Sequence, residues 1–236
     1  MPARFAGPPG SANGGYLCGR LSAHVPTHGA VVVTLRLPPP LDAPMTVERH
    51  GDGAHLLAND RLVAEAMPAE LDVDVVEPVD HAEAVQAATR YDGFTDHPFP
   101  ACFVCGPERA AGDGLRLFPG RVQDQTDSVA GAWVPDASLA HPDQDEVPEE
   151  FVWAALDCPG GWAVGLARRP MVLGRMTGQV DAIPKIGERC VVMGRVLGQE
   201  GRKAFTTSTA YDGDGRVLGR AHAVWIAVDP STLTPA

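Results

Sequence analysis

Residues 11–22, SANGGYLCGRLS, and residues 149–161, EEFVWAALDCPGG, are the two stretches that decide the fold of this chain. Both predict a largely apolar helix. In the first, Leu17 and Leu21, with Val25 just beyond the stretch, recur every four positions, which buries one helical face. The second is preceded by Pro148 and opens with two glutamates, residue types that favour a helix start. Several short β-patterned segments follow each helix, so the sequence predicts two similar halves.

The β-patterned segments are rich in β-branched residues and bounded by Gly, Pro, Asn or Asp. The expected strands are residues 30–37, 45–50, 54–57 and 62–67 in the first half, and 114–118, 128–134, 171–180, 189–197, 204–211 and 217–228 in the second. The turn at 212–215, Asp-Gly-Asp-Gly, predicts a hairpin between the last two. Residues 82–90 could form a short helix, and Pro159 is expected to kink or break the second long helix. A helix followed by antiparallel strands, occurring twice, indicates an α+β fold.

Composition narrows the function classes. The chain has 236 residues and a net charge of −11, which argues against nonspecific nucleic-acid binding, since that needs a basic surface. It contains no phosphate-binding glycine loop of Walker or Rossmann type, and no cofactor is expected. Five cysteines at irregular spacing do not suggest a disulfide framework, and no apolar run has the length of a signal peptide core or a membrane span. A cytoplasmic location is therefore expected.

The segment Cys102-Phe103-Val104-Cys105-Gly106, followed by Gly114-Leu115-Arg116-Leu117-Phe118, adds a recognisable pattern. Together with the two helix signatures and the closing hairpin, it resembles the thioesterase-like hotdog superfamily in its tandem form. The resemblance implies a double hotdog fold of two antiparallel sheets, each wrapping a central helix. The halves would be residues 1–90 and 91–236. Since one chain then supplies both halves of a hotdog dimer, a monomer or a homodimer of double units is expected.

The same resemblance implies a composite site. In single-hotdog acyl-CoA thioesterases the helix often begins His-Gly-Gly and carries an acid about two turns later. Here the first helix matches with Asn13-Gly14-Gly15 but has Ser22 at the acid position, whereas the second has Asp157 at the acid position but Pro148-Glu149-Glu150 at its start. One complete set would thus face across the halves, and the mirror-related site should be inactive. The expected substrate contacts are Tyr16, Trp153, Arg168 and Arg169, the two arginines for the phosphates of coenzyme A.

The predicted function is hydrolysis of an acyl-CoA-type thioester. Asp157 would be the nucleophile or general base, amides at Gly14 and Gly15 would polarise the carbonyl, and Asn13 would orient water or the acyl group. Because histidine is missing at position 13, a non-catalytic acyl-thioester or lipid-binding protein is the alternative. A third possibility is an enoyl-thioester hydratase with an Asp/His pair. Its candidates are Asp80-His81, Asp96-His97 and His141-Pro142-Asp143, none of which matches the hydratase motif.

Purely structural roles also fit these residues. Gly14 and Gly15 could let the helix start pass close to a strand, Asn13 could be only a helix cap, and Asp157 could cap a broken segment at Pro159. Cys102 and Cys105 have the C-x2-C spacing of zinc ligands, with His97 nearby. No second cysteine or histidine pair follows, however, so no metal is expected and the thiols are predicted to be packed in the core.

Overall fold

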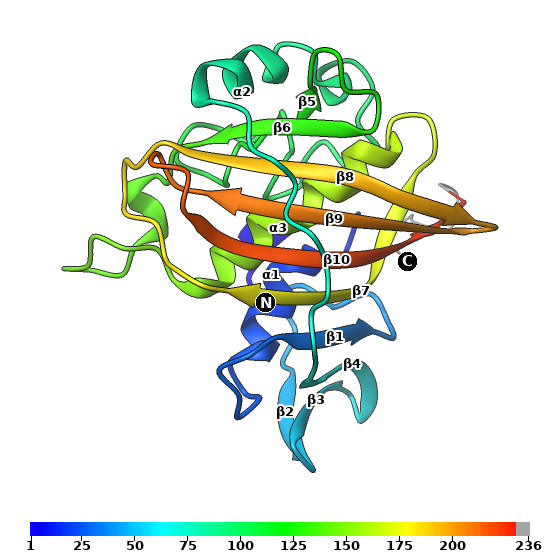
Figure 1. The fold of residues 1–236 in the computed structure, drawn as a ribbon. Helices are drawn as coiled ribbons and strands as arrows, with labels where there is room; N and C mark the ends of the chain where they lie inside the picture. Colours follow the sequence, from blue (N-terminus) through cyan, green and yellow to red (C-terminus); the bar gives the residue numbers. More distant parts are fainter. Residues whose placement is uncertain (230–236) are drawn as a thin grey trace.

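A computed structural model describes residues 1–229, and its centre is one antiparallel sheet of ten strands (Figure 1). The strand order is β2-β3-β4-β1-β7-β10-β9-β8-β6-β5. The strands are β1 Val31–Leu35, β2 Thr46–His50, β3 Gly53–Ala58, β4 Arg61–Pro68, β5 Gly120–Arg121, β6 Ser128–Trp133, β7 Met171–Val180, β8 Cys190–Glu200, β9 Lys203–Tyr211 and β10 Val217–Ala227. The helices are α1 Gly14–Ser22, α2 His81–Ala88 and α3 Glu149–Val164, with short 3-10 turns at Ala3–Phe5, Asp92–Phe94 and Ala137–Leu139.

The two expected sheets are joined into one. The first half contributes β1 to β4 and the second β5 to β10, and the seam is the antiparallel pair β1–β7, in which Val31 faces Gly178 and Thr34 faces Arg175. An edge strand presents unpaired backbone donors and acceptors, and here each half satisfies the other's edge. The predicted α+β class and antiparallel strands are confirmed, whereas the separation into two sheets is not found.

Both long helices lie on the same face of this sheet. α3 packs against β6 to β10, and every residue from Phe151 to Ala163 is buried. α1 packs against β1, β3, β4 and β7, and also contacts α3. A Cβ at Gly15 would lie 2.8 Å from the Trp153 backbone oxygen, and one at Gly19 would lie 2.6 Å from Glu150 Cα. The glycines of α1 therefore allow the two helices to touch through their backbones.

The opposite face of the sheet is crossed by the chain between β4 and α2 (Figure 1). Val76 anchors this crossing: its N–H donates to Thr209 Oγ1 at 3.0 Å, and its carbonyl accepts from the Tyr211 hydroxyl at 2.7 Å. Val76 also belongs to a second, smaller apolar core with Ala84 and Ala87 of α2. α2 thus packs with β5 and β6, strands of the second half.

Three local predictions are wrong: the strand at 114–118, the end of the first helix and the break at Pro159. Residues 114–118 are not a strand, because Gly114 and Arg116 have φ values of +104° and +51°, which no extended ladder permits. They follow the preceding turn instead, with Leu115 N–H donating to the Phe103 carbonyl at 2.9 Å. The first helix also stops at Ser22, earlier than the periodicity up to Val25 suggests.

Pro159 does not break α3, which continues to Val164 and ends at Gly165 in the left-handed conformation (φ +94°). Tertiary packing overrides the proline here. The Ser208 hydroxyl of β9 donates to the carbonyl of Leu156 at 2.6 Å, which ties this part of α3 to the sheet. A Cβ at Gly160 would lie 2.4 Å from Thr206 Oγ1, so the glycine after the proline permits close contact with β9.

The other predicted elements are confirmed within a few residues, including the hairpin at 212–215, where Asp212 N–H donates to the Arg216 carbonyl. Along residues 1–229, no helix combines the length and the apolar character needed to cross a membrane.

Candidate active site

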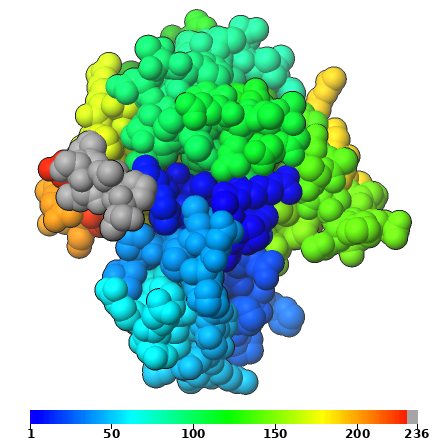
Figure 2. Space-filling view, turned by 180° about the vertical axis from the view of Figure 1, so that it is seen from behind, coloured from blue at the N-terminus to red at the C-terminus, as the bar shows by residue number. Residues whose placement is uncertain are grey.

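The start of α1 is fixed by its cap. Asn13 precedes the helix, and its side-chain oxygen accepts from the Tyr16 N–H at 2.9 Å. The side-chain nitrogen of Asn13 then points across to α3. Seen from behind (Figure 2), the N-terminal residues, in dark blue, lie between the light-blue first half and the green segment of the second half. The bonds from Asn13 and Gly15 to Asp157 show that the positive end of α1 is directed at α3.

Asp157 of α3 is the group that this helix start contacts. One carboxylate oxygen, Oδ2, accepts from Asn13 Nδ2 at 3.1 Å and from the Gly15 N–H at 3.0 Å. The other oxygen, Oδ1, is buried and accepts no hydrogen bond from any residue that the structure describes. Asp157 itself is 2% exposed. Because a buried polar atom without a partner is costly, Oδ1 marks a place where a ligand or water is expected.

Burial dominates the electrostatics of this carboxyl group. Desolvation raises the pKa of Asp157 to about 7, the neighbouring Cys102 raises it further, and the hydrogen bonds from Gly15 and Asn13 oppose the shift. Such a carboxyl can exchange protons near neutral pH, unlike an exposed aspartate.

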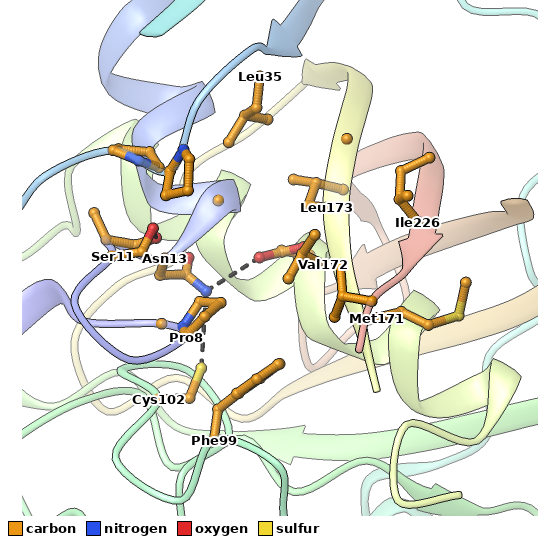
Figure 3. Close-up of a pocket in the computed structure, with 18 of the residues that line it drawn as sticks. Pro8, Ser11, Asn13, Leu35, Phe99, Cys102, Met171, Val172, Leu173 and Ile226 are labelled. Carbon is orange, nitrogen blue, oxygen red and sulfur yellow. Dashed lines mark hydrogen bonds between the residues drawn. The ribbon is translucent and has the colours of Figure 1, made fainter. Parts of the chain in front are cut away.

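A cavity of about 690 Å³ opens beside Asp157 (Figure 3). It is lined mainly by apolar side chains, among them Leu35, Phe99, Met171, Leu173 and Ile226. The Gly14 backbone also lines it, and the Gly14 N–H donates to no group among the described residues. The Gly15 and Tyr16 N–H groups are bound by Asp157 and Asn13, so of these three amides at the helix start only that of Gly14 is left for a ligand.

The predicted substrate contacts lie elsewhere. Tyr16 is buried in an aromatic cluster and stacks on Phe5 with ring centroids 4.0 Å apart, and Trp153 packs at the helix–helix contact. Arg169 donates to the Gly201 carbonyl at the β8–β9 turn, while Arg168 is exposed. None of the four is part of the cavity lining.

The cation that lines the cavity is Arg36, which follows β1 and pairs with Glu65. No motif in the sequence singles it out, because its position depends on how β1 turns toward the helix start. Ser22, the acid position of the mirror-related site, donates its hydroxyl to the Gly19 carbonyl at 2.8 Å as a local bond within α1.

Of the histidines considered for a hydratase, only His97 lines the cavity. It faces Cys105, with Nε2 3.4 Å from the sulfur, rather than its neighbour Asp96. His81 lies on α2, and His141 is exposed in the loop before α3. Cys102 and Cys105 also border the cavity, where they meet Cys158 of α3, a residue that local spacing could not connect to them.

Comparison with known proteins supports the fold. No protein-family profile matches the chain, and no curated protein is similar to it at a significant level. Solved structures do match over nearly the whole length. The tesB protein of Mycobacterium avium subspecies paratuberculosis shares 11% identity over 97% of this chain and 90% of its own, with a TM-score of 0.60. A conserved protein of unknown function with a hotdog fold from Alicyclobacillus acidocaldarius shares 13% identity over 98% and 92%, with a TM-score of 0.58.

A candidate thioesterase from Novosphingobium aromaticivorans gives a similar match, with 13% identity over 94% of this chain and 91% of its own and a TM-score of 0.60. At such low identity these likenesses concern the fold alone. The chain has the hotdog fold, in which a curved antiparallel sheet wraps around long helices.

Proposed function

We propose that this protein hydrolyses a thioester of the acyl-CoA type in the cavity beside Asp157. The observation that carries the proposal is the difference between the surroundings of the two oxygens of that carboxylate. One oxygen is held by Asn13 and Gly15 across the contact between α1 and α3, while the other is buried and unpartnered, and Asp157 lines a largely apolar cavity. An oriented carboxylate with a free oxygen suits a general base or nucleophile.

In this proposal Asp157 acts as the base. Its Oδ1 takes a proton from water as the water oxygen attacks the thioester carbonyl carbon, and the Gly14 N–H at the positive end of α1 stabilises the oxyanion. The tetrahedral intermediate then collapses, the C–S bond breaks, and the proton passes from Asp157 to the departing sulfur. Asn13 and Gly15 position the carboxylate; they do not contact the carbonyl.

The cavity suits the two ends of such a substrate. Leu35, Met171 and Leu173 offer an apolar wall for an acyl chain, whose transfer from water contributes about 0.8 kcal/mol per buried CH₂. Arg36 at the cavity edge could bind a phosphate of coenzyme A by exchanging its bond with Glu65. Arg168 and Arg169, the pair singled out in the sequence, lie outside the cavity lining.

The same proposal includes the architecture. We infer a tandem pair of hotdog halves, residues 1–90 and 91–236, that meet at β1 and β7 and share one site. A single chain would then be self-sufficient, as a monomer or as a homodimer of double units. The mirror-related position, with Ser22 in place of the acid, would be inactive.

One observation favours a second candidate, a non-catalytic acyl-thioester or lipid-binding protein. With the Gly15 and Tyr16 amides occupied, a single backbone donor remains for an oxyanion. Oxyanion sites commonly use two or more donors, and each one removed costs two to three orders of magnitude in rate. A weak or absent activity combined with tight binding would select this candidate.

The test is a panel of acyl-CoA substrates with free CoA measured by chromatography, since five cysteines in the protein could react with a thiol reagent. Asp157→Asn keeps the side-chain volume and should lower the rate by two orders of magnitude or more, roughly 3 kcal/mol in the barrier. Ser22→Ala is the matched control and should change the rate little. Full turnover by Asp157→Asn would refute the role of the carboxylate. Ligand binding without turnover by the wild type would leave only the binding function.

A further inference from the structure

Three buried cysteines gather beside the cavity, two from the turn at residues 102–105 and one from α3. The sulfurs of Cys102, Cys105 and Cys158 all lie within 4.8 Å of one another. We propose that these three thiolates bind a Zn²⁺ ion whose fourth position faces the cavity. This inference is independent of the proposed thioesterase activity.

The spacing of the sulfurs fits a tetrahedral ion. Zn–S bonds of about 2.3 Å in a tetrahedron place two ligand sulfurs about 3.8 Å apart. The distance from Cys102 Sγ to Cys158 Sγ is 3.8 Å. A disulfide would need about 2.05 Å between the two sulfurs. The three cysteines are thus free thiols in this structure, and their spacing has the size of a zinc site.

The turn that carries two of the ligands is rigidly held. The Gly106 N–H donates to the Cys102 carbonyl at 2.9 Å, and a Cβ at Gly106 would lie 2.4 Å from the Pro100 carbonyl oxygen, so only glycine fits. The Tyr91 hydroxyl donates to the Cys105 carbonyl at 2.8 Å. A turn held in this way presents both sulfurs of its C-x2-C pair to one ion.

Two N–H groups from outside the cluster are directed at its sulfur atoms. Asn13 Nδ2 donates to Cys102 Sγ at 3.8 Å, and His97 Nε2 lies 3.4 Å from Cys105 Sγ. The Phe99 N–H donates to His97 Nδ1 at 2.8 Å, which leaves the imidazole proton on Nε2, directed at the sulfur. His97 therefore stabilises a thiolate from outside the ligand set and is not itself a ligand. Hydrogen bonds to metal ligands commonly have this role.

The cluster lies at the wall of the cavity beside Asp157. The fourth position is open to a water or a ligand, because all three cysteines border the 690 Å³ cavity. Three protein ligands and an open position are typical of a reactive zinc site rather than of a closed structural one.

The test uses the untagged full-length chain, isolated without chelator. Its zinc content is measured by inductively coupled plasma mass spectrometry. One zinc per chain is expected. Cys158→Ser should lose the metal, while Cys18→Ser, a buried cysteine outside the cluster, should retain it. His97→Ala should keep the stoichiometry and bind zinc 10- to 100-fold more weakly, as expected for a residue that acts through a ligand.

Because a cysteine variant could fail to fold, the wild type supplies a second readout. Chelator-stripped protein titrated with Co²⁺ should develop a thiolate-to-cobalt charge-transfer band that Zn²⁺ abolishes. The proposal is overturned if the isolated protein lacks zinc and Co²⁺ produces no such band, or if a Cys102–Cys158 disulfide is found in protein kept under reducing conditions. Complete loss of zinc from folded His97→Ala would overturn the three-thiolate ligand set.

Discussion

Gly15→Ala examines the contact between α1 and α3 and the orientation of Asp157 in one change. The new Cβ would lie 2.4 Å from Asp157 Cβ and 2.8 Å from the Trp153 backbone oxygen. Ordinary contact begins at 3.4 Å, so the helices must separate by about 1 Å. The hydrogen bond from the Gly15 N–H to Asp157, now 3.0 Å, would lengthen to about 4 Å and be lost.

The expected cost follows from three contributions. Alanine gains about 1 kcal/mol over glycine in a helix. Overpacking costs about 1–3 kcal/mol, and loss of a buried hydrogen bond to a charged group costs about 1.5–3 kcal/mol. We expect the free energy of unfolding to fall by about 2–4 kcal/mol in urea titrations. Thioester turnover should fall by roughly 10- to 100-fold, because the positioned carboxylate is worth about 1.4–2.8 kcal/mol in the barrier.

Gly19→Ala is the matched control. Its Cβ would lie 2.6 Å from Glu150 Cα and 2.8 Å from Trp153 Cβ, so it separates the helices one turn away from Gly15 and should disturb the Asp157 hydrogen bond less. It should lose similar stability and less activity. A Gly15→Ala protein with wild-type stability and turnover would refute both the helix contact and the role of the Gly15 amide.

Three further outcomes are expected. Asn13→Ala should lower stability by about 1 kcal/mol through loss of the helix cap, and turnover roughly 10-fold through loss of the Asp157 contact; a rate equal to that of the wild type would argue against this positioning role. Since the folded pKa of Asp157 is about 7 and the unfolded one about 3.9, the folded state binds the proton more tightly, and wild-type stability should fall as pH rises from 4 to 7. Asp157→Asn should therefore exceed the wild type by up to ~4 kcal/mol at pH 8 and by almost nothing at pH 4, measured by denaturation, and a difference independent of pH would contradict this. Tyr211→Phe, which removes the bond to the Val76 carbonyl, should cost about 1 kcal/mol and speed proteolysis within residues 69–80; unchanged cleavage would show that the apolar contacts hold the crossing alone.

The sequence alone determined the local elements, because these depend on near neighbours. The strand patterns and the turn at 212–215 predicted β7 to β10 closely, and the Asn13-Gly14-Gly15 start predicted α1. Each of the two helices matches a different part of one family motif, and this match placed Asn13 and Asp157 in the same site. The two residues lie 144 positions apart in the chain, and the structure joins them by a hydrogen bond. This pairing was accessible because each helix retains a different half of the motif.

Tertiary structure alone decided the rest. Pro159 stays within α3 because this part of the helix is buried against β8 and β9, and β1 joins β7 because each is an edge that needs a partner. The distance between α1 and α3 decides whether Asp157 accepts a hydrogen bond from the Gly15 N–H, and therefore which backbone amide remains for a ligand. Cys158 meets Cys102 only because α3 is packed beside the turn at 102–105. Contacts between residues far apart in the chain depend on how the elements pack, and local spacing does not encode that packing.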